Sequence, residues 1–508
     1  MKKDNFFKNS ILLTLSNSTT GILKFIFSII LSRELGAEGM GLYALIMPIY
    51  DLFACLICGG MATAISKHSS SFYSKKNYES LHKSVHVTLV FDLIWSLIIV
   101  IIVFLNSKYI STNIIKDSRS LVSLLFICPA LIFVALSSII KGYFYGISKV
   151  KIPAFIDIFE KAIRIFVTVF AIRMLAFNQL ENTVSVVYGA LAAGEFVSFL
   201  LLYVFYKLSK HKDLLHQNAN NPHEGRAQLL FDVLIMAMPL CINGFLSTAI
   251  STVSTLILPR RLLLAGFTHS TSLSMIGKFS GMALTIIFFP LVVVTSMSIV
   301  LIPDIAETME KKDYYTLEQR IYQVIKISFL IGISTMIICF SIPDSLGKLF
   351  FARNDLATYI KFSALSAPFT YISYTTFSIL NGLGKQGVLL RNSLIVSIEE
   401  LIVLYILTSI PSINILGYGL SLMITSFTSV IINLKEIKKK CYIKFCFEDL
   451  FIDILLSLLV FFILNIINNL IPNTYFKLKT ISLIFLGFIL FFFSISFVHK
   501  TIKNNNTN

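Results

Sequence analysis

Charge is scarce in this sequence. Only 14% of its 508 residues are Asp, Glu, Lys or Arg, whereas soluble domains carry about 25%. Hydrophobic residues make up 56% of the chain, and the mean hydropathy is +0.80. The chain also lacks the segments of alternating polarity, about ten residues long, that are typical of membrane β-barrels. These absences exclude a soluble protein and a β-barrel.

The motifs of several enzyme classes are also missing. Gly384-Lys385 lacks the earlier glycine and the following Ser or Thr of a phosphate-binding loop, which argues against ATP hydrolysis. There is no D-x-D motif and no long polar segment that would hold a glycosyltransferase. The seven cysteines are too scattered for a disulfide framework, and Cys441 and Cys446 have no histidines nearby for a zinc site. We therefore expect no enzymatic activity, cofactor or metal.

Long apolar runs dominate the chain instead. A helix needs about 20 residues to cross the ~30 Å hydrocarbon core of a bilayer, and runs of this length recur throughout. They predict an all-α integral membrane protein with about 14 transmembrane helices. The predicted spans are 9–33, 40–66, 84–105, 120–141, 152–177, 183–207, 228–258, 272–302, 320–343, 356–381, 388–410, 413–434, 450–471 and 479–499.

The net charge of +16 comes from basic residues in short loops. No large polar domain is present to hold a nucleic acid, so none is expected as a partner. Lys and Arg are concentrated in alternate segments, above all 67–83, 207–226 and 435–444. Because cytoplasmic loops carry an excess of these residues, we expect a multi-pass cell-membrane protein with both termini in the cytoplasm.

Two parts of the chain resemble each other in a constant register. Residues 74–81 (SKKNYESL) return as 310–317 (EKKDYYTL), and Gly146 to Lys149 return as Gly382 to Lys385. Both matches have the same difference in residue number, so no gap is needed between them. This common offset indicates a parallel internal repeat of six helices, as in transporters that move two related bundles about a central site.

The repeat predicts three parts. Residues 1–227 form an N-lobe of helices 1–6, and residues 228–440 form a C-lobe of helices 7–12. Residues 441–508 hold helices 13 and 14 and a cytoplasmic tail. The two lobes are expected to be related by a pseudo-two-fold axis.

Two predicted spans each carry a lysine on a face of small and polar residues. An ionisable residue in hydrocarbon is costly, so it is expected to face a partner or a wet cavity. In span 9–33, Lys24 shares its face with Asn17, and in span 272–302, Lys278 lies on a similar face. We expect both lysines to line a shared cavity and offer positive charge to a phosphate.

Several segments resemble a known group of transporters. They are 31–43 (LSRELGAEGMGLY), 61–67, 301–307 and the two turns at 146–149 and 382–385. They are similar to segments of the multidrug/oligosaccharidyl-lipid/polysaccharide exporter superfamily. Within it they resemble the polysaccharide biosynthesis (oligosaccharide flippase) family, and in particular its stage V sporulation protein B branch. The resemblance implies two six-helix lobes around a central cavity.

The resemblance also implies a site. In the lipid-linked peptidoglycan precursor flippases of this superfamily, cationic residues on helices 1, 2 and 8 bind the anionic head group. The matching cavity residues here are Asn17, Lys24, Asp51 and Lys278, with an acidic residue in place of a base on helix 2. The alternative is structural, because Lys24 can instead form an ion pair with Asp51.

A second charged cluster lies in span 152–177. Its members are Asp157, Glu160, Lys161 and Arg164, and Glu160 and Arg164 have the i, i+4 spacing of a helical salt bridge. They are candidates for ion coupling or for a structural network that packs helices together.

The leading hypothesis is a flippase or exporter that moves a lipid-linked oligosaccharide across the cytoplasmic membrane by alternating access. A peptidoglycan or spore-cortex precursor is the expected substrate. The alternatives are a cation-coupled multidrug exporter of the same superfamily and a non-transporting scaffold for wall synthesis. Expected partners are the lipid-linked substrate and membrane lipids, with cell-wall synthesis proteins as further candidates.

Overall fold

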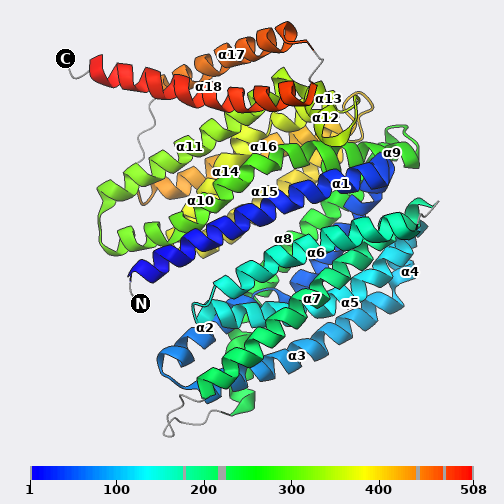
Figure 1. The fold of residues 1–508 in the computed structure, drawn as a ribbon, viewed down its shortest axis with the longest axis vertical. Coiled ribbons are helices and arrows are strands. Elements are labelled where there is room, and N and C mark those ends of the chain that lie inside the picture. Colours follow the sequence, from blue (N-terminus) through cyan, green and yellow to red (C-terminus); the bar gives the residue numbers. More distant parts are fainter. Residues whose placement is uncertain (1–2, 176–178, 215–224, 442–446, 473–475, 506–508) are drawn as a thin grey trace. The chain divides into compact units, whose positions relative to one another are not determined.

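The computed structural model describes residues 3–175, 179–214, 225–441, 447–472 and 476–505, and within these ranges every regular element is a helix (Figure 1). Ten of the helices in this described part are long and apolar enough to cross a membrane. The predicted all-α membrane fold is thus confirmed, whereas the number of about 14 spans stays a prediction. Helix α6 is not among the ten, and it carries the charged cluster predicted in span 152–177.

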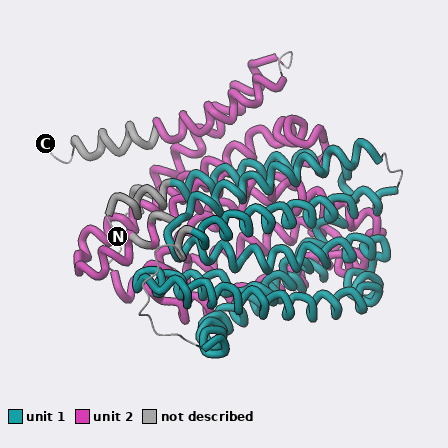
Figure 2. Tube along the Cα trace, turned by 60° about the horizontal axis from the view of Figure 1, so that its bottom comes forward, with its two compact units in different colours: residues 1–30, 34–257 teal, residues 31–33, 258–508 magenta. Residues whose placement is uncertain are grey.

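The chain forms two compact units (Figure 2). Unit 1 comprises residues 1–30 and 34–257, and unit 2 comprises residues 31–33 and 258–508. The helices that lie in unit 1 or begin there are α1 (Lys3–Cys58), α2 (Met61–Ser74), α3 (Tyr78–Leu105), α4 (Ser107–Tyr109), η1 (Ile110–Ile115), η2 (Ser118–Ser120), α5 (Leu121–Gly146), α6 (Lys151–Leu175), α7 (Leu180–Leu214) and α8 (Arg226–Leu264).

The remaining helices lie in unit 2. They are α9 (His269–Ile276), η3 (Gly277–Ala283), α10 (Leu284–Glu310), α11 (Tyr314–Ser341), α12 (Pro343–Phe351), α13 (Ala357–Ala364), α14 (Ala367–Gly382), α15 (Gln386–Leu407), α16 (Leu416–Lys438), α17 (Phe447–Leu470) and α18 (Phe476–Asn505). The predicted division into residues 1–227, 228–440 and 441–508 stays a prediction.

Helix α1 is broken at Gly36. The backbone there has φ 67° and ψ −172°, a conformation that residues with a Cβ rarely adopt. The break lies between the predicted spans 9–33 and 40–66. The second half of α1 then ends at Cys58, and Gly60, with φ 75°, precedes α2.

The two units repeat the same local structure at the common offset of the sequence matches. Helix α3 and helix α11 each have 28 residues, and their bounds differ by this offset at both ends. Both helices begin in the same way: the Asn77 side chain accepts a hydrogen bond from the amide of Ser80 at 3.1 Å, and Asp313 accepts one from the amide of Thr316 at 3.2 Å. These N-caps satisfy amides that have no partner within the helix.

Unusual backbone conformations recur at the same offset. The left-handed residues Lys76, Lys116 and Ser148 have counterparts at Lys312, Ala352 and Gly384. Each of these residues lies just after a helix. The repeat predicted from short sequence matches is therefore present in the turns of each unit, whereas the proposed symmetry axis stays a prediction.

A glycine fixes the packing of one helix pair in each unit. A Cβ added to Gly146 on α5 would lie 2.4 Å from the carbonyl oxygen of Ser66 on α2, so the two backbones are in close contact. In unit 2, a Cβ added to Gly382 on α14 would lie 2.9 Å from the carbonyl oxygen of Ile302 on α10. Ser66 and Ile302 are again related by the common offset. Small residues at such positions allow membrane helices to approach closely.

Each unit also holds a three-residue ion cluster, and the two clusters have opposite signs. In unit 1, Arg119 binds two carboxylates, those of Asp117 at 2.8 Å and Glu38 at 2.9 Å. In unit 2, Asp355 binds two cations. Arg353 and Lys278 each lie 2.7 Å from its carboxylate. The common offset relates position 119 to 355 and position 117 to 353.

Candidate functional site

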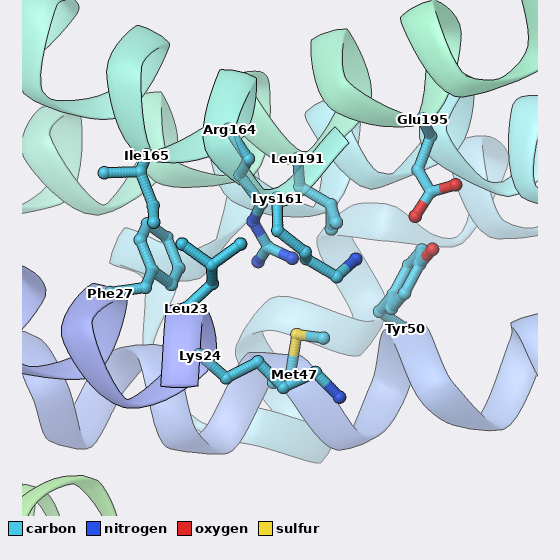
Figure 3. Close-up of a pocket in the computed structure, with 10 residues that line it drawn as sticks. All are labelled: Leu23, Lys24, Phe27, Met47, Tyr50, Lys161, Arg164, Ile165, Leu191 and Glu195. Atoms are coloured by element: carbon cyan, nitrogen blue, oxygen red, sulfur yellow. The ribbon is translucent and has the colours of Figure 1, made fainter. Parts of the chain in front are cut away.

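A cavity of about 160 Å³ lies within unit 1, between α1, α6 and α7 (Figure 3). Helix α1 contributes side chains from both sides of its break, α6 contributes a charged face, and α7 closes one wall. The lining residues are Leu23, Lys24, Phe27, Met47, Tyr50, Lys161, Arg164, Ile165, Leu191 and Glu195. Apolar side chains form much of the wall, and the polar groups are mainly basic.

Three basic side chains reach this cavity. Lys24 comes from α1, and Lys161 and Arg164 come from α6, where their i, i+3 spacing places them on one face. In Figure 3 the three side chains point into the space between α1 and α6, whereas Glu195 and the hydroxyl of Tyr50 lie together at another side. The cavity wall therefore has three cations and one carboxylate.

Arg164 is buried, with only 7% of its surface exposed. Its guanidinium stacks over the Phe27 ring at 4.9 Å from the centroid, and it donates a hydrogen bond to the Tyr43 hydroxyl at 3.4 Å. Its buried Nε atom has no hydrogen-bond partner within the described residues. A buried donor without a partner costs about 1–3 kcal/mol, so this atom favours a ligand with an acceptor oxygen.

The neighbouring α7 backbone allows α6 to present these charges. Gly194 is buried, and a Cβ in its place would lie 3.0 Å from Glu160 Oε1 and 3.5 Å from the Arg164 Cβ. Glu160 forms an ion pair with Lys161, and its other oxygen, Oε1, has no hydrogen-bond partner in the described part of the chain. The Glu160 carboxylate thus neutralises part of the charge beside the cavity without closing it.

The predicted charged cluster of α6 is divided by the structure. Lys161 and Arg164 line the cavity, with Glu160 beside them. Asp157 lies one turn earlier and forms an ion pair with Lys141 of α5 at 2.6 Å. Asp157 therefore ties α6 to α5, and the expected role of the cluster in ion coupling stays a prediction.

The predicted cavity residues of α1 have different surroundings. Lys24 lines the cavity, whereas Asn17 and Asp51 are exposed and are not part of its wall. Within the described residues, the Asp51 carboxylate is not within ion-pairing distance of Lys24. The two residues still attract each other electrostatically, so the structural alternative also stays a prediction. The substrate-binding roles of all three residues stay predictions.

Lys278 is held in an ion pair in unit 2. It lies in the π-helix η3, a type of distortion that is common at functional sites. Hydrogen bonds from Arg353 and Lys278 hold the pKa of the Asp355 carboxyl, between α12 and α13, well below its usual range. The Lys278 ammonium is thus neutralised, and the prediction that it shares a cavity with Lys24 stays a prediction.

The grouping of Lys24 with Lys161, Arg164 and Glu195 was not predicted from the sequence. The spacing of Glu160 and Arg164 indicated only that these two residues share a face of α6. Which helix that face would meet depends on packing between segments that are far apart in the chain. One such contact is the hydrogen bond from the Ser16 hydroxyl of α1 to the carbonyl oxygen of Ala154 of α6.

Comparisons with known proteins give a consistent picture. Residues 6–309 match the family described as polysaccharide biosynthesis protein. Stage V sporulation protein B of Bacillus subtilis (strain 168) is 25% identical over 426 residues, which cover 83% of this chain and 82% of that protein. The lipid II flippase MurJ of the same organism is 23% identical, over 80% of this chain and 77% of that protein.

Solved structures share the fold. The lipid II flippase MurJ in an inward closed conformation aligns with a TM-score of 0.72 and 18% identity, over 97% of this chain and 100% of that chain. An inward-facing multidrug resistance transporter of the MATE family and MOP superfamily aligns with a TM-score of 0.66 and 14% identity, over 85% and 100%. The fold is therefore that of membrane transporters.

Proposed function

Because the chain belongs to the polysaccharide biosynthesis protein family, as its sequence motifs predicted, we propose that it is a flippase for a lipid-linked oligosaccharide. The relatives whose names state an activity are a flippase and transporters, not enzymes. The observation that carries the proposal is the set of three basic side chains, Lys24, Lys161 and Arg164, at a cavity with otherwise largely apolar walls.

The chemistry of this cavity suits a phosphate or pyrophosphate. Such a group brings negative charge and several acceptor oxygens, and hydrogen bonds between charged partners are about twice as strong as neutral ones. The planar guanidinium of Arg164 can donate two parallel bonds, and its free Nε is one of the donors. The two ammonium groups add charge without fixed direction. The hydrogen bonds and ion pairs formed in the cavity would thus offset the hydration that the anion loses on leaving water.

The substrate is proposed to be a peptidoglycan or spore-cortex precursor. This proposal is supported by the similarity to stage V sporulation protein B and to the lipid II flippase. Alternating access is the proposed mechanism, because repeated halves are typical of transporters that work in this way. The N-caps and turns that recur in the two units support this mechanism, because they indicate that the two halves are repeats of each other.

A multidrug exporter is the second candidate, since MATE transporters share the fold. Exported drugs are often cations, and the three cations of this cavity outnumber the carboxylates of Glu195 and the adjacent Glu160, so its net positive charge repels them. The charge of the cavity therefore favours the lipid-linked anion over a cationic drug.

Reconstitution separates these functions. We expect purified protein in vesicles to move a fluorescent lipid diphosphate oligosaccharide between leaflets, measured by loss of protection from a quencher that cannot cross the membrane. Protein-free vesicles provide the background rate, and a fluorescent cationic drug is the second cargo. Transport of the drug, with lipid exchange at the background rate, would show that the flippase proposal is wrong.

The proposed orientation has both termini in the cytoplasm, because Lys and Arg are concentrated in alternate loops. A cysteine placed at the exposed Asn113 should react with an impermeant thiol reagent in intact cells. A cysteine at the exposed Lys439 should react only after the membrane is opened. Reaction at Lys439 in intact cells would reverse the orientation.

A further inference from the structure

A second cavity, of about 490 Å³, lies within unit 2 and involves the last two helices, α17 and α18. It is formed by α12, the segment that follows it, the end of α17 and the start of α18. Figure 1 shows α12 and α18 in the same part of unit 2, and the two helices pack together. Its polar lining residues include Asp344, Lys348, Asn354, Asn468, Asn469 and Lys479.

Two lysines give this cavity its charge. Lys479 is more than nine-tenths buried, and its ammonium donates a hydrogen bond to the carbonyl oxygen of Ile471 at 2.7 Å. The Lys348 ammonium lies 5.0 Å from the centroid of the Phe476 ring. Among the described residues, no carboxylate is within ion-pairing distance of Lys348, although Asp344 is one turn earlier on α12. Two cations thus face one carboxylate across the cavity.

Exposed apolar side chains continue along α17 and α18, beside the residues that line the cavity. Leu470 at the end of α17 is 75% exposed, Leu478 at the start of α18 is 66% exposed, and Phe485 is 64% exposed. Both helices are among those that are apolar enough to cross a membrane. A polar, cationic cavity at the end of an exposed apolar surface is the arrangement that an amphipathic lipid requires, with its head group in one part and its acyl chains along the other.

We propose that this cavity binds the head group of an anionic glycerophospholipid. The phosphate lies between Lys348 and Lys479, and the side-chain amides of Asn354, Asn468 and Asn469 bind the hydroxyls of the head group. The acyl chains follow the exposed surface of α17 and α18. Without a bound lipid, the cavity would be a water-filled crevice at the membrane surface, in which Lys479 only fixes the end of α17.

The test uses the full-length protein in detergent, with phosphatidylglycerol as the probe and phosphatidylcholine as the neutral lipid. Native mass spectrometry counts the lipids that stay bound. We expect Lys348→Gln to lower retention of phosphatidylglycerol about tenfold relative to the unchanged protein. Lys477→Gln is the matched control, because Lys477 is exposed, lies on the same helix end as Lys479 and does not line the cavity.

Further arms identify the source of the phosphate. Inorganic phosphate and glycerol phosphate, added without lipid, test a soluble ligand. If they displace phosphatidylglycerol at low concentration, the site takes a soluble anion and the lipid proposal is wrong. Asn469→Leu changes no charge and should also lower retention. Equal retention of phosphatidylglycerol in Lys348→Gln and Lys477→Gln would show that the lipid proposal is wrong and that the cavity is a water-filled crevice.

The outcome is independent of the proposed flippase activity. Lys348→Gln should leave translocation of the lipid-linked oligosaccharide unchanged, because the two cavities share no lining residue. Failure of the lipid site therefore leaves the flippase proposal standing, and failure of flipping leaves the lipid site standing.

Discussion

Replacing Lys24 by Gln is expected to reduce translocation of the lipid-linked substrate by about 10- to 100-fold, with normal insertion of the protein. A hydrogen bond to a charged group contributes about 1.5–3 kcal/mol, and each step of about 1.4 kcal/mol is a factor of ten in binding. Insertion should not suffer, because removal of a charge lowers the cost of placing the helix in hydrocarbon. Lys161→Gln should act in the same direction, although its ion pair with Glu160 makes part of the loss structural.

Translocation is measured in vesicles at equal protein content. Lys151→Gln is the matched control, since Lys151 is an exposed lysine of α6 that does not line the cavity. Lys24→Arg should keep partial activity, because it preserves the charge but changes its geometry. The double variant Lys24→Ala/Asp51→Ala separates the structural alternative. If it restores flipping, Lys24 balances Asp51 and does not bind phosphate.

Replacing Gly146 by Ala should destabilise the protein by about 2–3 kcal/mol, near the upper end of the usual cost of an overpacked core. The new Cβ would lie 2.4 Å from the carbonyl oxygen of Ser66, a backbone atom that cannot rotate away. Gly142, one turn earlier on α5, has a similar contact with Ala62 of α2. The two helices must therefore separate along a whole turn, and we expect a lower midpoint of thermal unfolding and less protein in the membrane.

Two other glycines calibrate this effect. Gly382→Ala, at the equivalent position of unit 2, should destabilise less, because the closest contact would be 2.9 Å. Gly387→Ala should be neutral or slightly stabilising, since a Cβ there meets no atom within 4 Å. An unfolding midpoint for Gly146→Ala equal to that of Gly387→Ala would contradict the close packing of α5 on α2.

The parts of the fold that were predictable depend on local sequence. Apolar runs predicted the helices, and the matching turns at Gly146 and Gly382 predicted the repeat, because a turn is determined by a few neighbouring residues. The break at Gly36 lies at the weak polar interruption that the sequence places between two spans. The number of crossings stays a prediction, since helices that carry several charges, such as α6, are not among the ten that are apolar enough to cross a membrane.

The site was predictable only in part. Lys24 was identified because an isolated cation on an apolar helix is costly in hydrocarbon unless it faces a partner or a wet cavity. Its association with Arg164 and Glu195 depends on which faces of α1, α6 and α7 meet, and a single sequence does not contain that information. Lys278 had the same sequence signal as Lys24, yet its ammonium forms an ion pair with Asp355, which comes from a later segment of the chain. The same local pattern therefore led to two different environments.

The opposite ion clusters of the two units bear on how the halves diverged. If one ancestral half was duplicated, both copies began with the same sign at positions 119 and 355, yet Arg119 now binds two carboxylates and Asp355 binds two cations. The third member of each cluster has no charged counterpart, because the common offset relates Glu38 to Ser274 and Lys278 to Leu42. Each half therefore completes its cluster with a charge from a position that is uncharged in the other half, and Lys278 has the sign that Asp355 requires. A graft of residues 353–355 onto 117–119 would bring Glu38 against a second acid.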